Sequence, residues 1–107
     1  MTNIRILVID DESVICDGCR LILTEKGYHV DTSPTGSSGL RSIEAEAYDV
    51  ILLDMKLLDI DGMEILRHVR ADQPAVYVIV MTGYSTVSNA VEAMTLGAFD
   101  YLAKPFD

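Results

Sequence analysis

Acidic side chains follow two apolar segments of the sequence directly. Asp10 and Asp11 come after the first segment, with Glu12 next to them, and Asp54 ends the other. Carboxylates held close together raise one another's pKa, so such a cluster is costly without a cation. Carboxylate oxygens suit Mg²⁺, which keeps several of its water ligands. If the fold brings the two segment ends together, the acids predict a magnesium site.

A hydroxyl and an ammonium group follow two further apolar segments. Thr82 comes after the segment 76–81, and Lys104 comes after the segment 99–103. A phosphoryl group in transfer needs its oxygens stabilised, and Mg²⁺, Thr82 and Lys104 offer one contact each. The Asp54 carboxylate is then the predicted nucleophile, and the product is an acyl phosphate. Thr82 and Lys104 are weak signals alone, but with the acids they predict a phosphoryl-accepting site.

Helix capping is the alternative interpretation of the first acidic pair. Either Asp10 or Asp11 could accept N–H groups at the start of the helix expected from Ser13. Capping explains neither the adjacent pair nor Asp54, so the metal-binding interpretation is preferred.

Short apolar runs alternate with amphipathic stretches along the chain. Continuous aliphatic runs are typical of strands buried on both faces, and apolar residues at helical spacing predict the helices between them. The expected strands are 4–9, 28–32, 49–54, 76–81 and 99–103. The expected helices are 13–26, about 39–47, 63–70 and about 86–96.

Repeated strand–helix–strand units predict an α/β fold with helices on both faces of a parallel sheet. Five strands in this order predict a doubly wound, flavodoxin-like sheet with the strand order 2-1-3-4-5. Such a sheet binds ligands beyond the carboxyl ends of its strands, where the strand order reverses. The chemistry is therefore expected just after residues 9 and 53.

This combination of residues resembles the receiver domains of two-component response regulators. The resemblance runs from Ile4 to the last residue and includes the closing Lys104-Pro105. It implies that Asp11 and Asp54 bind Mg²⁺ directly. It also implies that Asp10 binds the ion largely through water.

Further expectations come from the same resemblance. The backbone carbonyl of Lys56 would complete the protein ligands of Mg²⁺. Thr82 would turn toward the phosphoryl group and Tyr101 would rotate inward behind it, which would reshape the face of the fourth helix and fifth strand. A half-buried aromatic on an edge strand is the alternative interpretation of Tyr101. The peptide bond between Lys104 and Pro105 would be cis, held by its surroundings against a trans preference of ~0.5–1 kcal/mol.

The implied phosphoryl donor is a phosphohistidine on a sensor histidine kinase or phosphotransfer protein, because neither His29 nor His68 is expected near the site. The implied reader of the switch is an output domain or a partner, which includes a second copy of the chain. A phosphatase with an Asp nucleophile would need an acid at position 56, which is Lys. A classical enzyme is therefore not expected, only self-phosphorylation from a phosphodonor and autodephosphorylation. The alternative function is a receiver-like interaction module that works without phosphorylation.

Charge and hydropathy narrow the class of protein. The 107 residues include 17 acidic and 8 basic side chains, which gives a net charge of −9. Phosphate contacts need clustered basic residues, so direct nucleic-acid binding by this segment is not expected. No apolar run approaches the ~18 residues of a membrane span, and a signal peptide is not recognisable. One domain in the cytoplasm is expected.

Two departures from the receiver pattern stand out. Leu58 occupies the place where the family usually has Pro, so the loop lacks a fixed φ there. The chain ends at Asp107, where the family has a fifth helix. We therefore expect a receiver domain over residues 1–107 that is truncated before its last helix. The segment 97–107 resembles receivers that precede activators of sigma-54 transcription.

Cys16 and Cys19 form a CxxC spacing within the first expected helix. A structural zinc site would need two more soft ligands, and none lies nearby in the sequence. Cys19 falls on the apolar stripe and Cys16 lies one position off it. Two reduced cysteines in or beside a core helix are expected.

Overall fold

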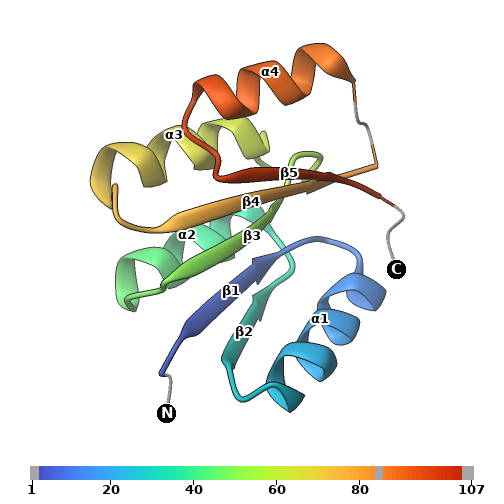
Figure 1. Ribbon diagram of the computed structural model, residues 1–107, viewed down its shortest axis with the longest axis vertical. Coiled ribbons are helices and arrows are strands. Elements are labelled where there is room, and N and C mark those ends of the chain that lie inside the picture. The colour runs from blue at the N-terminus through green and yellow to red at the C-terminus, as the bar shows by residue number, and fades with distance from the viewer. Residues whose placement is uncertain (1–2, 84–85, 105–107) are drawn as a thin grey trace.

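The computed structural model describes residues 3–83 and 86–104. Its centre is a five-stranded parallel sheet with the strand order β2-β1-β3-β4-β5 (Figure 1). The strands are β1 (Arg5–Ile9), β2 (His29–Ser33), β3 (Val50–Asp54), β4 (Tyr77–Thr82) and β5 (Asp100–Ala103). The helices are α1 (Ser13–Glu25), α2 (Gly36–Ala45), α3 (Gly62–Asp72) and α4 (Val87–Thr95). The predicted α/β fold and strand order are confirmed.

Helices cover both faces of the sheet (Figure 1). α1 packs on one face, where Cys16 joins Ile6 and Val8 in a buried cluster. α2, α3 and α4 lie on the other face, where they contribute to a buried cluster that includes Leu7 and Ile9. Because β1 contributes to both clusters, its continuous apolar run is buried on both sides, as expected for a central parallel strand.

α2 begins at Gly36, whereas the sequence predicted a start near Gly39. The Thr35 hydroxyl accepts a hydrogen bond from the Ser38 N–H at 3.0 Å, and the Ser38 hydroxyl lies 3.3 Å from the Thr35 N–H. This reciprocal arrangement is a capping box. Ser37 and Ser38, which precede the predicted start, therefore lie in the first turn of the helix.

The two cysteines of α1 are free, as predicted, but their order of burial is reversed. Cys16 is buried and Cys19 is only partly buried. The Cys16 thiol donates a hydrogen bond to the Asp10 carbonyl at 3.3 Å. Burial, followed by the charge of Asp10, raises the pKa of Cys16 to about 11. At neutral pH it is a protonated core thiol rather than a reactive thiolate.

The longest helix, α1, has 13 residues. Within the part of the chain that the structure describes, no helix has the length and apolar composition that crossing a bilayer requires.

Candidate functional site

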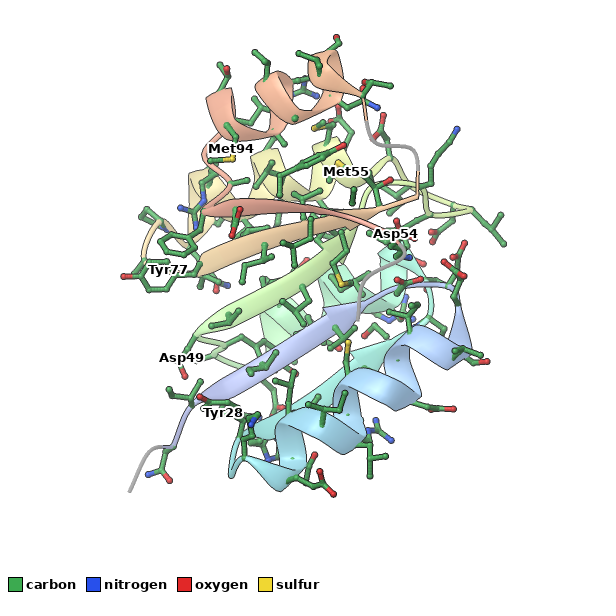
Figure 2. All side chains as sticks on the ribbon, turned by 45° about the vertical axis from the view of Figure 1, so that its right-hand side comes forward. Tyr28, Asp49, Asp54, Met55, Tyr77 and Met94 are labelled. Atoms are coloured by element: carbon green, nitrogen blue, oxygen red, sulfur yellow. The ribbon has the colours of Figure 1, made fainter. Side chains whose placement is uncertain are left out.

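Four strand ends bring polar side chains to one edge of the sheet. Asp10 follows β1, Asp54 ends β3, Thr82 ends β4 and Lys104 follows β5. A pocket of about 460 Å³ hollows this edge and is lined in part by Asp54 and Lys104. Asp49, the residue before β3, and Asp54, its last residue, lie at opposite ends of the strand (Figure 2), and Asp54 lines the pocket. The candidate residues therefore gather beyond the carboxyl ends of the strands, where a sheet of this topology binds its ligands.

The Lys104 ammonium lies among three carboxylates. Its Nζ is 2.7 Å from Oδ2 of Asp10, 2.8 Å from Oε1 of Glu12 and 3.6 Å from Oδ2 of Asp54. The backbone of Lys104 is held on the sheet, because its N–H donates a hydrogen bond to the Thr82 carbonyl at 2.8 Å. Burial by itself lowers the pKa of Lys104, but the hydrogen bonds to Asp10 and Glu12 outweigh it and raise the pKa. The side chain is therefore a fixed positive charge.

The Asp54 carboxylate is buried, with 3% of the residue exposed. Burial and then the charge of Asp10 raise its pKa to about 6, although the Lys56 N–H and the Lys104 charge act in the opposite direction. The Lys56 N–H donates to Oδ1 of Asp54 at 3.3 Å. An ionised Asp54 is thus under-compensated by its protein neighbours, so additional positive charge in the pocket would favour it.

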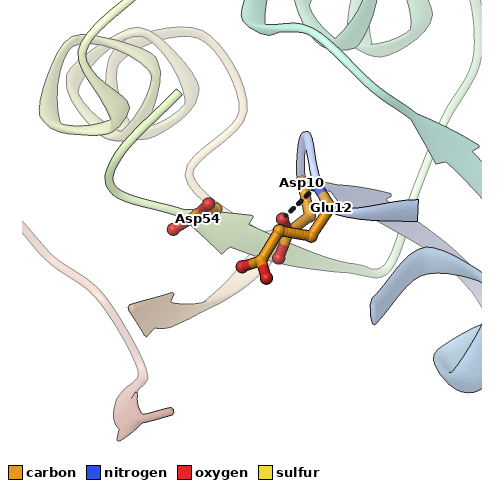
Figure 3. Close-up of side chains that lie close together, drawn as sticks. All are labelled: Asp10, Glu12 and Asp54. Carbon is orange, nitrogen blue, oxygen red and sulfur yellow. Dashed lines mark hydrogen bonds between the residues drawn. The ribbon is translucent and has the colours of Figure 1, made fainter. Parts of the chain in front are cut away.

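Three carboxylates are close enough to share a cation. Single oxygens of Asp10, Glu12 and Asp54 all lie within 4.8 Å of one another (Figure 3). Oxygen donors of this kind fit a hard divalent ion such as Mg²⁺. The raised pKa of Asp54 supports the same interpretation, because a cation would offset both of its causes, the burial of the charge and the repulsion from Asp10.

The carboxylate group with Asp10 and Asp54 contains Glu12 and not Asp11. Asp11, the predicted direct ligand, is partly buried and lines the same pocket as Asp54. Glu12 was not among the predicted site residues, yet it both joins the carboxylate group and pairs with Lys104. Its place directly after the acid pair was the available signal. Asp10 also accepts the Glu12 N–H at 2.9 Å (Figure 3). Glu12 precedes Ser13, the first residue of α1, so this bond does not cap an N–H group of the helix.

Thr82 and Tyr101 occupy neighbouring strands behind the pocket. Thr82 is fully buried, and the residue after it, Gly83, lines the pocket. Tyr101 packs partly buried against the main core, and its hydroxyl is buried with no hydrogen-bond partner among the described residues. A partly buried aromatic ring on the edge strand β5 is what the alternative interpretation of Tyr101 describes, and its role as a switch stays a prediction.

Other predicted residues fall outside this group. Pro105, and with it the predicted cis peptide bond, lies outside the described residues. His29 pairs with Asp31 at 3.3 Å, and His68 pairs with Asp72 at 3.2 Å. Among the described contacts, neither histidine joins the carboxylate cluster, as the sequence predicted.

Comparisons of the sequence and of the fold with known proteins identify the same family. Residues 6–107 match the family described as response regulator receiver domain. The transcriptional regulatory protein ZraR of Escherichia coli is 39% identical over 105 residues, which cover 98% of this chain and 24% of that relative. The chain therefore spans about a quarter of the length of this curated relative.

Solved structures agree. A response regulator receiver domain protein from Methanospirillum hungatei is 36% identical, with a TM-score of 0.95 over 99% of this chain and 85% of that one. A response regulator from Burkholderia pseudomallei, solved with a phosphorylated aspartic acid, a calcium ion and citrate, is 31% identical. Its TM-score is 0.92 over 98% of this chain and 62% of that one.

Proposed function

Because the chain belongs to the response regulator receiver domain family, we propose that it is the phosphoryl-accepting switch of a two-component system, with Asp54 as the acceptor. The observation that carries the proposal is the pairing of a buried Asp54 with the Lys104 ammonium 3.6 Å away, inside a carboxylate group able to hold a cation. The phosphorylated aspartic acid in the Burkholderia relative supports this chemistry.

The donor is a phosphohistidine on a sensor histidine kinase or phosphotransfer protein. A carboxylate oxygen of Asp54 attacks the phosphorus, and an O–P bond forms as the P–N bond to the histidine breaks. The leaving imidazole nitrogen keeps the electron pair and takes a proton from solvent. The product is an acyl phosphate on Asp54, and water later attacks it in autodephosphorylation. The protein turns over no external substrate.

Mg²⁺ is the proposed cofactor. Asp10, Asp11, Asp54 and the Lys56 backbone carbonyl would hold it, and Glu12 is close enough to contribute. The ion would offset the charge that gathers on the transferred oxygens.

Lys104 and Thr82 stabilise the transferred group from the protein side. The Lys104 ammonium, already 3.6 Å from Asp54, would pair with one phosphoryl oxygen. Such preorganised charge is worth more in a partly buried site than in water. The Thr82 hydroxyl, at the end of the strand next to β3, would donate to another oxygen.

The output is proposed to run through Tyr101 to the face of α4 and β5. α4 is loosely held: Ala93 is its buried residue, whereas Val87 and Val91 are 83% and 59% exposed. A helix that buries so little is suited to moving when Thr82 and Tyr101 rearrange. An output domain, a partner or a second copy of the chain would read this face. A sigma-54-type regulator as the parent protein stays a prediction.

Beryllofluoride, a mimic of the acyl phosphate, tests the proposal. With Mg²⁺ present, we expect it to shift the amide NMR signals at the carboxyl ends of β1, β3 and β5. Asp54→Asn should abolish the shifts. Asp49→Asn, at the other end of β3, is the matched control and should keep them. Failure of the native chain to bind beryllofluoride with Mg²⁺ would overturn the proposal.

A further inference from the structure

The loop between β3 and α3, residues 55–61, is tied at its tip to the start of α2. The Asp59 carboxylate accepts hydrogen bonds from the Gly36 N–H at 2.8 Å, the Ser37 N–H at 3.0 Å and the Ser37 hydroxyl at 2.8 Å. These bonds hold the pKa of Asp59 well below its usual range, at about 2. At neutral pH the carboxylate is therefore ionised and able to accept all three.

The contact completes the N-terminus of α2. The first N–H groups of a helix have no partner within the helix. Thr35 accepts from the Ser38 N–H, and Asp59 accepts from the two N–H groups before it, those of Gly36 and Ser37. A negative charge at this end of a helix is also favourable. The loop and the helix thus hold each other through complementary donors and acceptors.

Glycine at position 36 makes the close approach possible. A Cβ there would lie 2.9 Å from Cβ of Ile60 and 3.0 Å from Oδ1 of Asp59. Any other residue would push the loop away from α2. The approach is therefore a packed contact between two segments and not a chance meeting of surface groups.

The base of the same loop is fixed separately, on the sheet. The Gly62 N–H donates to the Met55 carbonyl at 3.1 Å, and a Cβ on Gly62 would lie 2.6 Å from the Asp54 carbonyl oxygen. Asp61, two residues after Asp59, caps α3 by accepting the Met63 N–H at 2.9 Å. An isolated antiparallel bridge between Lys56 and Asp61 closes this base. At the tip, Ile60 packs against the core, and Asp59 supplies the hydrogen bonds to α2.

We propose that Asp59 is a positioning residue for the metal site. By holding the loop tip on α2, it holds the backbone carbonyl of Lys56 where the ion needs it. The inference rests on the proposed function. Leu58 is 92% exposed, and its N–H makes no hydrogen bond within residues 3–83 and 86–104. Leu58 therefore contributes little to the rigidity of the loop. Asp59 restrains the loop instead, as the fixed φ of a proline at position 58 would do.

The test compares Asp59→Ala with Asp61→Asn, which removes the same charge from the same loop but can keep its cap. Two quantities are measured: amide hydrogen exchange in metal-free protein, and Mg²⁺ affinity by calorimetry. For Asp59→Ala we expect faster exchange at residues 36–37 and 55–61 and about 10-fold weaker Mg²⁺ binding, because groups that orient metal ligands contribute on this scale. Asp61→Asn should lose much less affinity and leave exchange at residues 36–37 unchanged.

Leu58→Pro in the Asp59→Ala background supplies a rescue. If loop order is what Asp59 contributes, the proline should restore a large part of the lost Mg²⁺ affinity without restoring protection at Gly36 and Ser37. A purely structural role for Asp59 in capping α2 would not be rescued in this way. Equal Mg²⁺ affinity in the Asp59→Ala and Asp61→Asn variants would overturn the inference and leave the proposed function standing. A native chain that binds no Mg²⁺ would overturn both, and that result is seen before any variant is compared.

Discussion

The Nζ of Lys104 lies 3.6 Å from Oδ2 of Asp54, although 50 residues separate them in the sequence. β4 lies between their strands, β3 and β5, and the Lys104 side chain reaches over its end. Nζ of Lys104 lies closer to the carboxylates of Asp10 and Glu12 than to that of Asp54. The ammonium thus lies beside the proposed acceptor without fully compensating its charge.

The first prediction concerns stability. The pKa of Asp54 is raised from its ordinary value to about 6, so between roughly pH 4 and pH 6 the folded protein binds more protons than the unfolded chain. The free energy of unfolding therefore falls as pH rises through this window. Asp54→Asn should remove that fall and stabilise the metal-free protein at pH 7 by about 1–2 kcal/mol, allowing for solvent screening. Urea unfolding at pH 4 and pH 7 measures it. A variant less stable than the native protein at pH 7 would contradict the assignment of an under-compensated charge.

The second prediction isolates the source of the raised pKa. Asp10 is the largest contribution after burial. Asp10→Asn should therefore shift the titration midpoint of Asp54 downward, toward its ordinary range, when the carboxyl carbon is followed by NMR without divalent ions. Asp17→Asn, an exposed acid on α1, serves as the charge-matched control and should leave the midpoint close to the native one. An unchanged midpoint in Asp10→Asn would contradict the contribution of Asp10 and leave burial, with the smaller contribution of Asp11, as the cause.

The third prediction concerns the rate of phosphorylation. Lys104→Gln removes the charge beside the acceptor, and groups that stabilise developing charge in enclosed sites contribute about 100-fold in rate. We expect phosphorylation by acetyl phosphate with Mg²⁺ to slow on this order. Lys26→Gln, at the end of α1 and outside the site, is the control. Comparable rates in the two variants would show that Lys104 does not act on the transferred group.

The fourth prediction concerns the packing of α2 beneath the site. A Cβ on Gly39 would lie 2.6 Å from Cδ1 of Ile9, the residue before Asp10. Gly39→Ala should therefore destabilise the protein by about 1–3 kcal/mol, despite the better helix propensity of Ala. Gly18→Ala is the matched control, because a Cβ there meets no atom within 4 Å, and it should stabilise by up to about 1 kcal/mol. Ile9→Val, which removes Cδ1, should recover part of the loss in a double variant. Strict additivity of the two changes would argue against the contact.

Much of the fold was predictable because its determinants are local. A short β-branched apolar run such as the one before Asp10 favours a strand buried on both faces. Gly27, two residues after the end of α1, has the positive φ of 93° that commonly follows a helix end. The start of α2 was not predictable, because it depends on Asp59, 23 residues from Gly36, as well as on the capping box of Thr35 and Ser38.

The site also contains contacts that the sequence predicts and contacts that it does not. Strand topology alone brings Asp54 and Lys104 to one edge, so their proximity could be expected from the order of the elements. The pairing of Glu12 with Lys104 depends on side-chain reach across 92 residues of sequence, and no pattern in the chain specifies it. The choice between Asp11 and Glu12 as neighbours of a cation is likewise a matter of side-chain geometry.

The most direct test of the central claim is the intact mass of the protein after incubation with Mg²⁺ and acetyl phosphate. The account predicts that the native chain gains the mass of one phosphoryl group, that removal of Mg²⁺ prevents the gain, and that Asp54→Asn abolishes it. A native chain that gains no such mass, or an Asp54→Asn variant that gains it equally, would contradict the account.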